Sequence, residues 1–251
     1  MKKFVIAALV TGLFTVGAYA QKDGTATTAA STTVSAPAAK GDAKPEDIAK
    51  ATLAAHGGDK LKKMLTLVIK GSVDVNVSNQ IMPGGFSTAI SGSKYYFEIT
   101  TPMQSIKQIS DGEQTYSSIR GFMLPPANSV GFAVIARIGD EGYTISPYGD
   151  GKKKGKGFRV VSPDGFYTDF TVDEKTSQVK GFESAFELGS GQVITTSATI
   201  DEMQTVEGLV IPKKYSQRFE FGTQLTAYAT FKAKDILVNP QMAENAFAIP
   251  K

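Results

Sequence analysis

The segment LVIKGSVDVNV, residues 67–77, decides the fold class because its side chains alternate in character. One face carries Leu67, Ile69, Gly71, Val73, Val75 and Val77, and the other carries Lys70, Ser72, Asp74 and Asn76. Successive side chains of a β-strand point to opposite faces, so this alternation predicts a strand with one buried face.

The same alternation returns along most of the chain after residue 77. Further faces are made by Tyr95, Phe97 and Ile99; by Phe166, Thr168, Phe170 and Val172; by Tyr215, Gln217, Phe219 and Phe221; and by Leu225, Ala227, Ala229, Phe231 and Ala233. Turn signals recur about every ten to fifteen residues. They include Met82-Pro83-Gly84-Gly85, Asp111-Gly112, Pro163-Asp164-Gly165 and Asp173-Glu174-Lys175-Thr176. This spacing predicts one curved antiparallel sheet rather than two domains.

Two segments have helical rather than alternating character. Pro45 suits the first position of a helix, Glu46 and Asp47 suit its positive end, and Gly57-Gly58 ends it. Residues 129–138 are apolar without alternation and are followed by Gly139, which is consistent with a second helix. The sequence therefore predicts an α+β protein.

The N-terminal segment indicates export. Lys2 and Lys3 precede an apolar run from Phe4 to Val16, and Ala18 and Ala20 supply the small residues of a cleavage site. Residues 1–20 are predicted to be a signal peptide cleaved after Ala20, and the periplasm of a Gram-negative bacterium is the expected location. Residues 21–44 are rich in Thr, Ala and Ser and are predicted to be a disordered linker before a domain over 45–251.

Composition excludes several classes of chemistry. The chain has no cysteine or tryptophan and one histidine, so no thiolate site or histidine metal cluster is possible. Residues 21–251 carry 25 basic and 24 acidic side chains, which gives no reason to expect nucleic acid. His56-Gly57-Gly58 imitates an esterase oxyanion loop, but the Gly-x-Ser-x-Gly elbow of that chemistry is missing. His56 is therefore interpreted as a helix-end residue, and no catalytic residue, metal or cofactor is predicted.

The order of several short motifs resembles that of one family. The motifs are AHGGDKL (55–61), LVIKGS (67–72), KYYFEI (94–99), ISDG (109–112), VEGLVIPK (206–213) and the terminal FAIP (247–250). Over roughly residues 45–251 the chain resembles the outer-membrane lipoprotein-sorting superfamily, the LolA/LolB-like periplasmic carriers. The resemblance implies a half-barrel of about eleven antiparallel strands, with helices covering its concave face and acyl chains carried inside.

The inward-facing apolar side chains have two interpretations, a packed core or the lining of an apolar cavity. The candidates for a cavity lining are Leu67, Ile69, Val73, Val75, Tyr95, Phe97, Ile99, Phe132, Phe166, Phe170, Phe182 and Phe219. The resemblance implies a carrier for a lipid or acylated lipoprotein, with an envelope protein as donor or acceptor and at most transient membrane contact. The alternative is a non-enzymatic envelope sensor or scaffold with the same fold.

Overall fold

Twelve antiparallel strands form one sheet in the computed structural model, which describes residues 43–119, 123–151, 155–187, 193–221 and 225–250. The strands are β1 (Leu67–Val77), β2 (Gln80–Ser91), β3 (Lys94–Thr100), β4 (Ser105–Ser110), β5 (Thr115–Ser117), β6 (Thr144–Pro147), β7 (Gly157–Val161), β8 (Tyr167–Val172), β9 (Val179–Glu187), β10 (Val193–Val206), β11 (Leu209–Phe221) and β12 (Leu225–Val238). The helices are α1 (Pro45–Ala55), α2 (Asp59–Lys62) and the 3₁₀ helices η1 (Gly131–Arg137) and η2 (Tyr148–Gly151).

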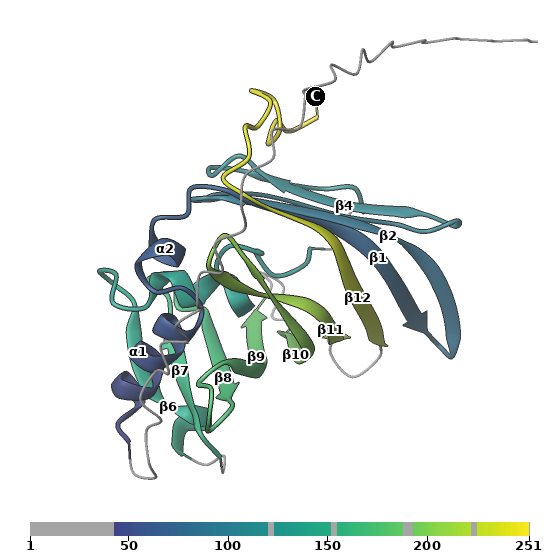
Figure 1. Cartoon of the computed structure of the whole chain (residues 1–251). Coiled ribbons are helices and arrows are strands. Elements are labelled where there is room, and N and C mark those ends of the chain that lie inside the picture. Colours follow the sequence, from purple (N-terminus) through teal and green to yellow (C-terminus); the bar gives the residue numbers. More distant parts are fainter. Residues whose placement is uncertain (1–42, 120–122, 152–154, 188–192, 222–224, 251) are drawn as a thin grey trace, which may run out of the picture. The chain divides into compact units, whose positions relative to one another are not determined.

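The sheet consists of two meanders joined at its centre. Its strand order is β5-β4-β3-β2-β1-β12-β11-β10-β9-β8-β7-β6, so every neighbouring pair except β1 and β12 is consecutive in the chain. The first and last strands pair in the middle, with Leu67 opposite Val238 and Val77 opposite Ala227. In Figure 1 the sheet bends between the part that contains β6–β9 and the part that contains β1–β4.

Register shifts accompany this bending. Irregularities lie between Lys70 and Gly71 in β1 and on either side of Glu202 in β10. An extra residue in one strand of a pair bends that strand and increases its twist. At Gly71 a Cβ atom would lie 2.0 Å from the carbonyl oxygen of Lys232, so the close approach of β12 requires glycine there.

Helix α1 packs over β6 and β7 (Figure 1), and η1 packs against α1 and β9. Ile48 and Ala49 of α1 belong to a buried cluster with Ile135 of η1 and with Phe158 and Phe170 of the sheet. Phe158 and Phe170 are fully buried and stack with ring centroids 5.2 Å apart. A second buried cluster lies on the other part of the sheet and comprises Val73, Phe86, Ile99, Phe219, Ala229 and Phe231.

Most of the local expectations match these elements. Strand β1 has the predicted bounds, α1 begins at Pro45, and η1 lies inside the predicted helix 129–138. The predicted antiparallel sheet is present, with twelve strands in the described part of the chain instead of about eleven. The predicted signal peptide lies outside the described residues, as does nearly all of the predicted linker.

The turn predicted at residues 82–85 is wrong. The chain reverses at Ser78 and Asn79, which have φ of 50° and 64°, and β2 continues through Met82, Pro83 and Gly84. Proline is tolerated there because β3 begins its pairing with β2 only at Gly85, so this end of β2 is paired with β1 alone. The Pro83-Gly84 pair thus indicated a turn, whereas it lies in a part of β2 that has a partner strand on one side only.

Candidate functional site

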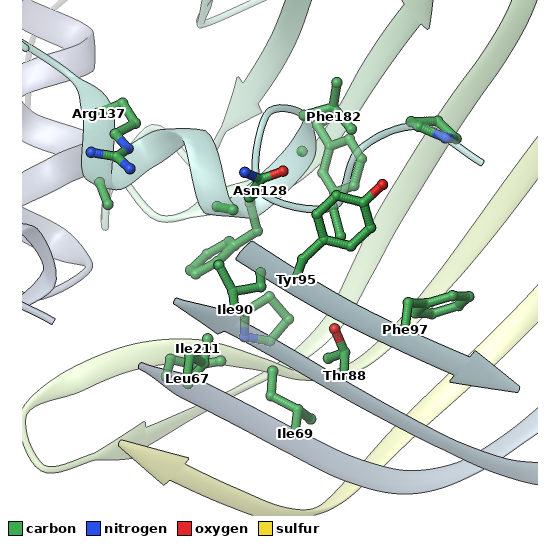
Figure 2. A pocket seen from close by; sticks show the side chains of 18 of the residues that line it. Leu67, Ile69, Thr88, Ile90, Tyr95, Phe97, Asn128, Arg137, Phe182 and Ile211 are labelled. Atoms are coloured by element: carbon green, nitrogen blue, oxygen red, sulfur yellow. The ribbon is translucent and has the colours of Figure 1, made fainter. Parts of the chain in front are cut away.

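A cavity of about 330 Å³ lies between the sheet and the segment that contains η1. Figure 2 shows part of its lining. Most of the side chains around it are apolar. They include Leu61, Met64, Leu65, Leu67, Ile69, Ile90, Tyr95, Phe97, Leu124, Pro125, Val130, Phe132, Ala133, Ala136, Phe182, Ile200, Ile211, Pro212, Tyr215 and Phe219. The cavity therefore receives side chains from both meanders and from the connection between them.

Strands β1, β2 and β3 line one side of the cavity with alternate residues. Leu67 pairs with Ile90, which pairs with Tyr95. Two residues further along β1, Ile69 pairs with Thr88, and Thr88 pairs with Phe97. Figure 2 shows these side chains together on neighbouring strands. The alternation of side chains along these strands thus produces two rows on the lining that are largely apolar.

Strands β9, β10 and β11 supply most of the remaining lining that comes from the sheet. Phe182 comes from β9, Thr196 and Ile200 from β10, and Ile211, Tyr215, Gln217 and Phe219 from β11. The Tyr215 ring stacks on Phe231 of β12 with centroids 4.8 Å apart. Burial raises the pKa of the Tyr215 hydroxyl, which therefore stays neutral at physiological pH.

The segment over the cavity is fixed to the sheet by a buried glutamine. Gln108 of β4 is 2% exposed, and its Nε2 donates to the Leu124 carbonyl at 3.0 Å and to Tyr95 Oη at 2.7 Å. Its Oε1 accepts a hydrogen bond from the Leu124 amide at 2.8 Å. Further along, the Gly131 amide donates to Thr168 Oγ1 at 3.0 Å. These bonds hold Leu124 and η1 over the sheet.

Two cations lie on the cavity lining and share one carboxylate. Lys62 Nζ is 2.7 Å from Asp140 Oδ1, and Arg137 Nη1 is 3.5 Å from Asp140 Oδ2. Lys62 Nζ also donates to the Ile138 carbonyl at 2.9 Å. The side chains of Lys62 and Arg137 are 30% and 41% exposed, so the charged groups lie at the solvent edge of the cavity.

His56 lies outside the cavity lining and joins three elements. It forms the C-cap of α1, as the sequence predicted, and it is fully buried. Nε2 accepts from the Val179 amide at 3.0 Å, so Nδ1 carries the proton and donates to the Val210 carbonyl at 2.6 Å. Burial lowers the pKa of His56. Its ring meets Phe132, a lining residue, edge to face at 5.0 Å.

The structure divides the twelve residues proposed as cavity candidates into two groups. Leu67, Ile69, Tyr95, Phe97, Phe132, Phe182 and Phe219 line the cavity. Val73, Val75 and Ile99 pack in or against the second buried cluster, and Phe170 lies in the first. Phe166 packs edge to face on Phe186 at 6.4 Å, away from the lining.

Sequence reasoning missed much of the lining. Tyr215 and Gln217 alternate with Phe219 on one strand face, and this signal could have added them to the candidates. Ile90 alternates with Thr88 in the same way on β2. Leu124, Pro125 and Val130 lie in a segment without periodicity, so no sequence pattern marks them.

The described ranges contain neither a metal-binding cluster of side chains nor a helix that could cross a membrane. No group of three or more His, Asp and Glu side chains there is arranged to hold a metal ion. None of the helices there is long and apolar enough to cross a membrane.

The known proteins that resemble this chain were found by their backbone traces and not by their sequences. No family model and no curated protein matches the sequence. A LolA superfamily protein from Nitrosomonas europaea is 10% identical, with a TM-score of 0.49 over 82% of this chain and 98% of that one. A DUF1329 family protein from Desulfovibrio piger is 8% identical, with a TM-score of 0.48 over the same shares. A chain in the structure of the Pseudomonas aeruginosa MucA/MucB complex is 7% identical, with a TM-score of 0.25 over 78% of this chain and 100% of that one.

Proposed function

We propose that this chain is a carrier that encloses an acyl chain of a lipid or a lipid-modified protein in its cavity, and that it makes and breaks no covalent bond. The observation that supports this most directly is the apolar cavity of about 330 Å³. Packed protein interiors contain few voids larger than a water molecule. Pockets that bind small molecules have volumes of about 300–1,000 Å³ and mainly apolar linings.

The lining suits a flexible hydrocarbon chain. Burial of each methylene group is worth about 0.8 kcal/mol, and about 1.4 kcal/mol corresponds to a tenfold change in affinity. Each added methylene should therefore tighten binding about three- to fourfold until the chain fills the cavity. Beyond that length the affinity should stop rising. The sequence resemblance to the LolA/LolB-like carriers points to the same ligand class.

In this proposal the protein acts in the periplasm after removal of residues 1–20. The basic, apolar and small-residue regions of that segment have the order of a secretion signal. Expression of the whole gene in a Gram-negative host should give a soluble periplasmic protein that begins at Gln21. Full-length chain recovered in the membrane fraction would contradict this location.

The test is a titration of the purified protein, prepared without detergent, with saturated fatty acids of increasing length. The expected result is displacement of a fluorescent apolar probe, with an affinity that rises and then levels off. Bound acid should also raise the melting temperature by mass action. Absence of binding at every length, for the acids and for their methyl esters alike, would overturn the carrier proposal in favour of the envelope sensor or scaffold.

A matched pair of variants on β2 locates the binding. Thr88 lines the cavity, whereas its neighbour Ser87 lies on the opposite face of the strand. Thr88→Phe should fill the cavity and abolish fatty-acid binding in a folded protein. The Ser87→Phe variant should bind fatty acids with the same affinity as the unchanged protein. Equal binding by both variants would show that the acid binds elsewhere.

A further inference from the structure

The polar groups on the cavity lining differ in whether the protein already satisfies them. Gln108 uses both its amide nitrogen and its oxygen, and Thr88 Oγ1 donates to the Tyr96 carbonyl at 3.1 Å. Gln217 Nε2 donates to Thr196 Oγ1 at 2.7 Å. Within the described ranges, Tyr215 Oη has no hydrogen-bond partner, and Gln217 Nε2 has a second N–H beyond the one that it donates to Thr196. Tyr215 and Gln217 therefore each keep a hydrogen-bond donor that is free to bind a ligand.

Tyr215 and Gln217 are placed to act together. They are two residues apart on one face of β11, so their backbones are separated by about 6–7 Å along the strand. Gln217 pairs with Ala198 on one side and Ala229 on the other. Because both paired residues are alanines, the Gln217 side chain remains accessible from the cavity. The stack on Phe231 fixes the Tyr215 ring.

Among the residues that the structure describes, no formal charge on the lining complements an anion at this position. The cationic side chains of this described lining are Lys62 and Arg137, and both already pair with Asp140 near the solvent edge. The Tyr215 hydroxyl remains neutral and is a hydrogen-bond donor. A carboxylate buried beside it would lose hydration without gaining a countercharge, which is costly. An ester or amide carbonyl needs only the donors that Tyr215 and Gln217 offer.

We propose that Tyr215 and Gln217 form a hydrogen-bonding subsite that binds the uncharged carbonyl of an acyl ester or amide within the cavity. This inference rests on the proposed carrier function and specifies its ligand class. Acyl chains attached through esters would bind with the carbonyl at β11 and the hydrocarbon among the apolar side chains. A free fatty acid would lose affinity on ionisation.

The test compares three probes of equal chain length: methyl laurate, laurate and a linear alkane. Their affinities are measured by displacement of N-phenylnaphthylamine from the unchanged protein, from Tyr215→Phe and from Tyr228→Phe. Tyr228 is a matched control because it is 51% exposed and does not line the cavity. Tyr215→Phe should bind the methyl ester about tenfold more weakly, the value of one hydrogen bond, and bind the alkane unchanged. Tyr228→Phe should bind all three probes as the unchanged protein does.

Several results would overturn the subsite. One is a Tyr215→Phe variant that keeps its affinity for the ester, or that loses affinity for ester and alkane alike. Another is a preference for laurate that disappears in Arg137→Gln, because it would place the head group at the cationic edge. If Tyr215→Phe does not fold, Gln217→Met carries the same comparison. If the alkane and the ester both fail to bind the unchanged protein, the carrier function itself fails.

Discussion

The two parts of the sheet use the same alternating pattern with different results. Over β6–β9 the inward side chains meet α1 and η1, and Phe158, Phe170 and Ile135 are fully buried in a solid core. Over β1–β3 and β10–β11 only some inward side chains pack in the second buried cluster, and others face a cavity of about 330 Å³. What lies opposite a strand face thus decides whether its apolar residues form a core or a lining. Truncation in the two parts should have different consequences.

The largest effect is expected in the packed part. Phe170→Ala removes a fully buried ring that stacks on Phe158 and is not part of the cavity lining. Its free energy of unfolding should fall by about 3–5 kcal/mol. The folded fraction should keep the chain-length preference of the unchanged protein. Denaturant unfolding and fatty-acid titration measure the two quantities, and a changed preference would mean that the cavity extends into this core.

A smaller loss of stability is expected from the equivalent truncation in the cavity. Phe97 is only partly buried and borders existing space, so Phe97→Ala should cost about 1–2 kcal/mol, less than a core truncation. Because the cavity is enlarged, the acyl-chain length at which the affinity stops rising should increase. The same two measurements apply. A loss of stability as large as that of Phe170→Ala, with no shift in chain length, would make Phe97 part of a solid core.

The smallest effect is a pH dependence that originates beside the packed part. Burial holds the folded-state pKa of His56 below its ordinary value of 6.5, so the unfolded chain binds more protons than the folded chain below pH 6.5. The free energy of unfolding should therefore decrease as the pH falls from 6.5, by at most about 1.4 kcal/mol per pH unit.

His56→Gln isolates this contribution. Glutamine can donate to the Val210 carbonyl and accept from the Val179 amide without titrating. Unfolding curves measured between pH 7 and about 5 should be flatter for the variant. If stability falls with pH equally in the variant and in the unchanged protein, the pH dependence comes from groups other than His56. Fatty-acid binding at neutral pH should persist in the folded variant, because His56 lies outside the cavity lining.

The sequence predicted the strands better than the site. Alternation located β1 to the residue, because a two-residue period depends only on which side chains are buried. It could not separate Phe97 at the cavity from Phe170 in the core, since both are inward-facing aromatics on strands. That difference depends on where α1 and η1 pack. Leu124 reaches the cavity through the hydrogen bonds of Gln108, a contact sixteen residues distant in sequence that no local pattern encodes.

We propose above all that the cavity between the sheet and the segment that contains η1 holds an acyl chain in the cell. Native mass spectrometry of the protein isolated from the periplasm without detergent tests this most directly. We expect an added mass that dissociates as a lipid, and that is absent from Thr88→Phe but present in Ser87→Phe. A protein of unmodified mass in all three samples, which also binds no fatty acid after purification, would contradict it.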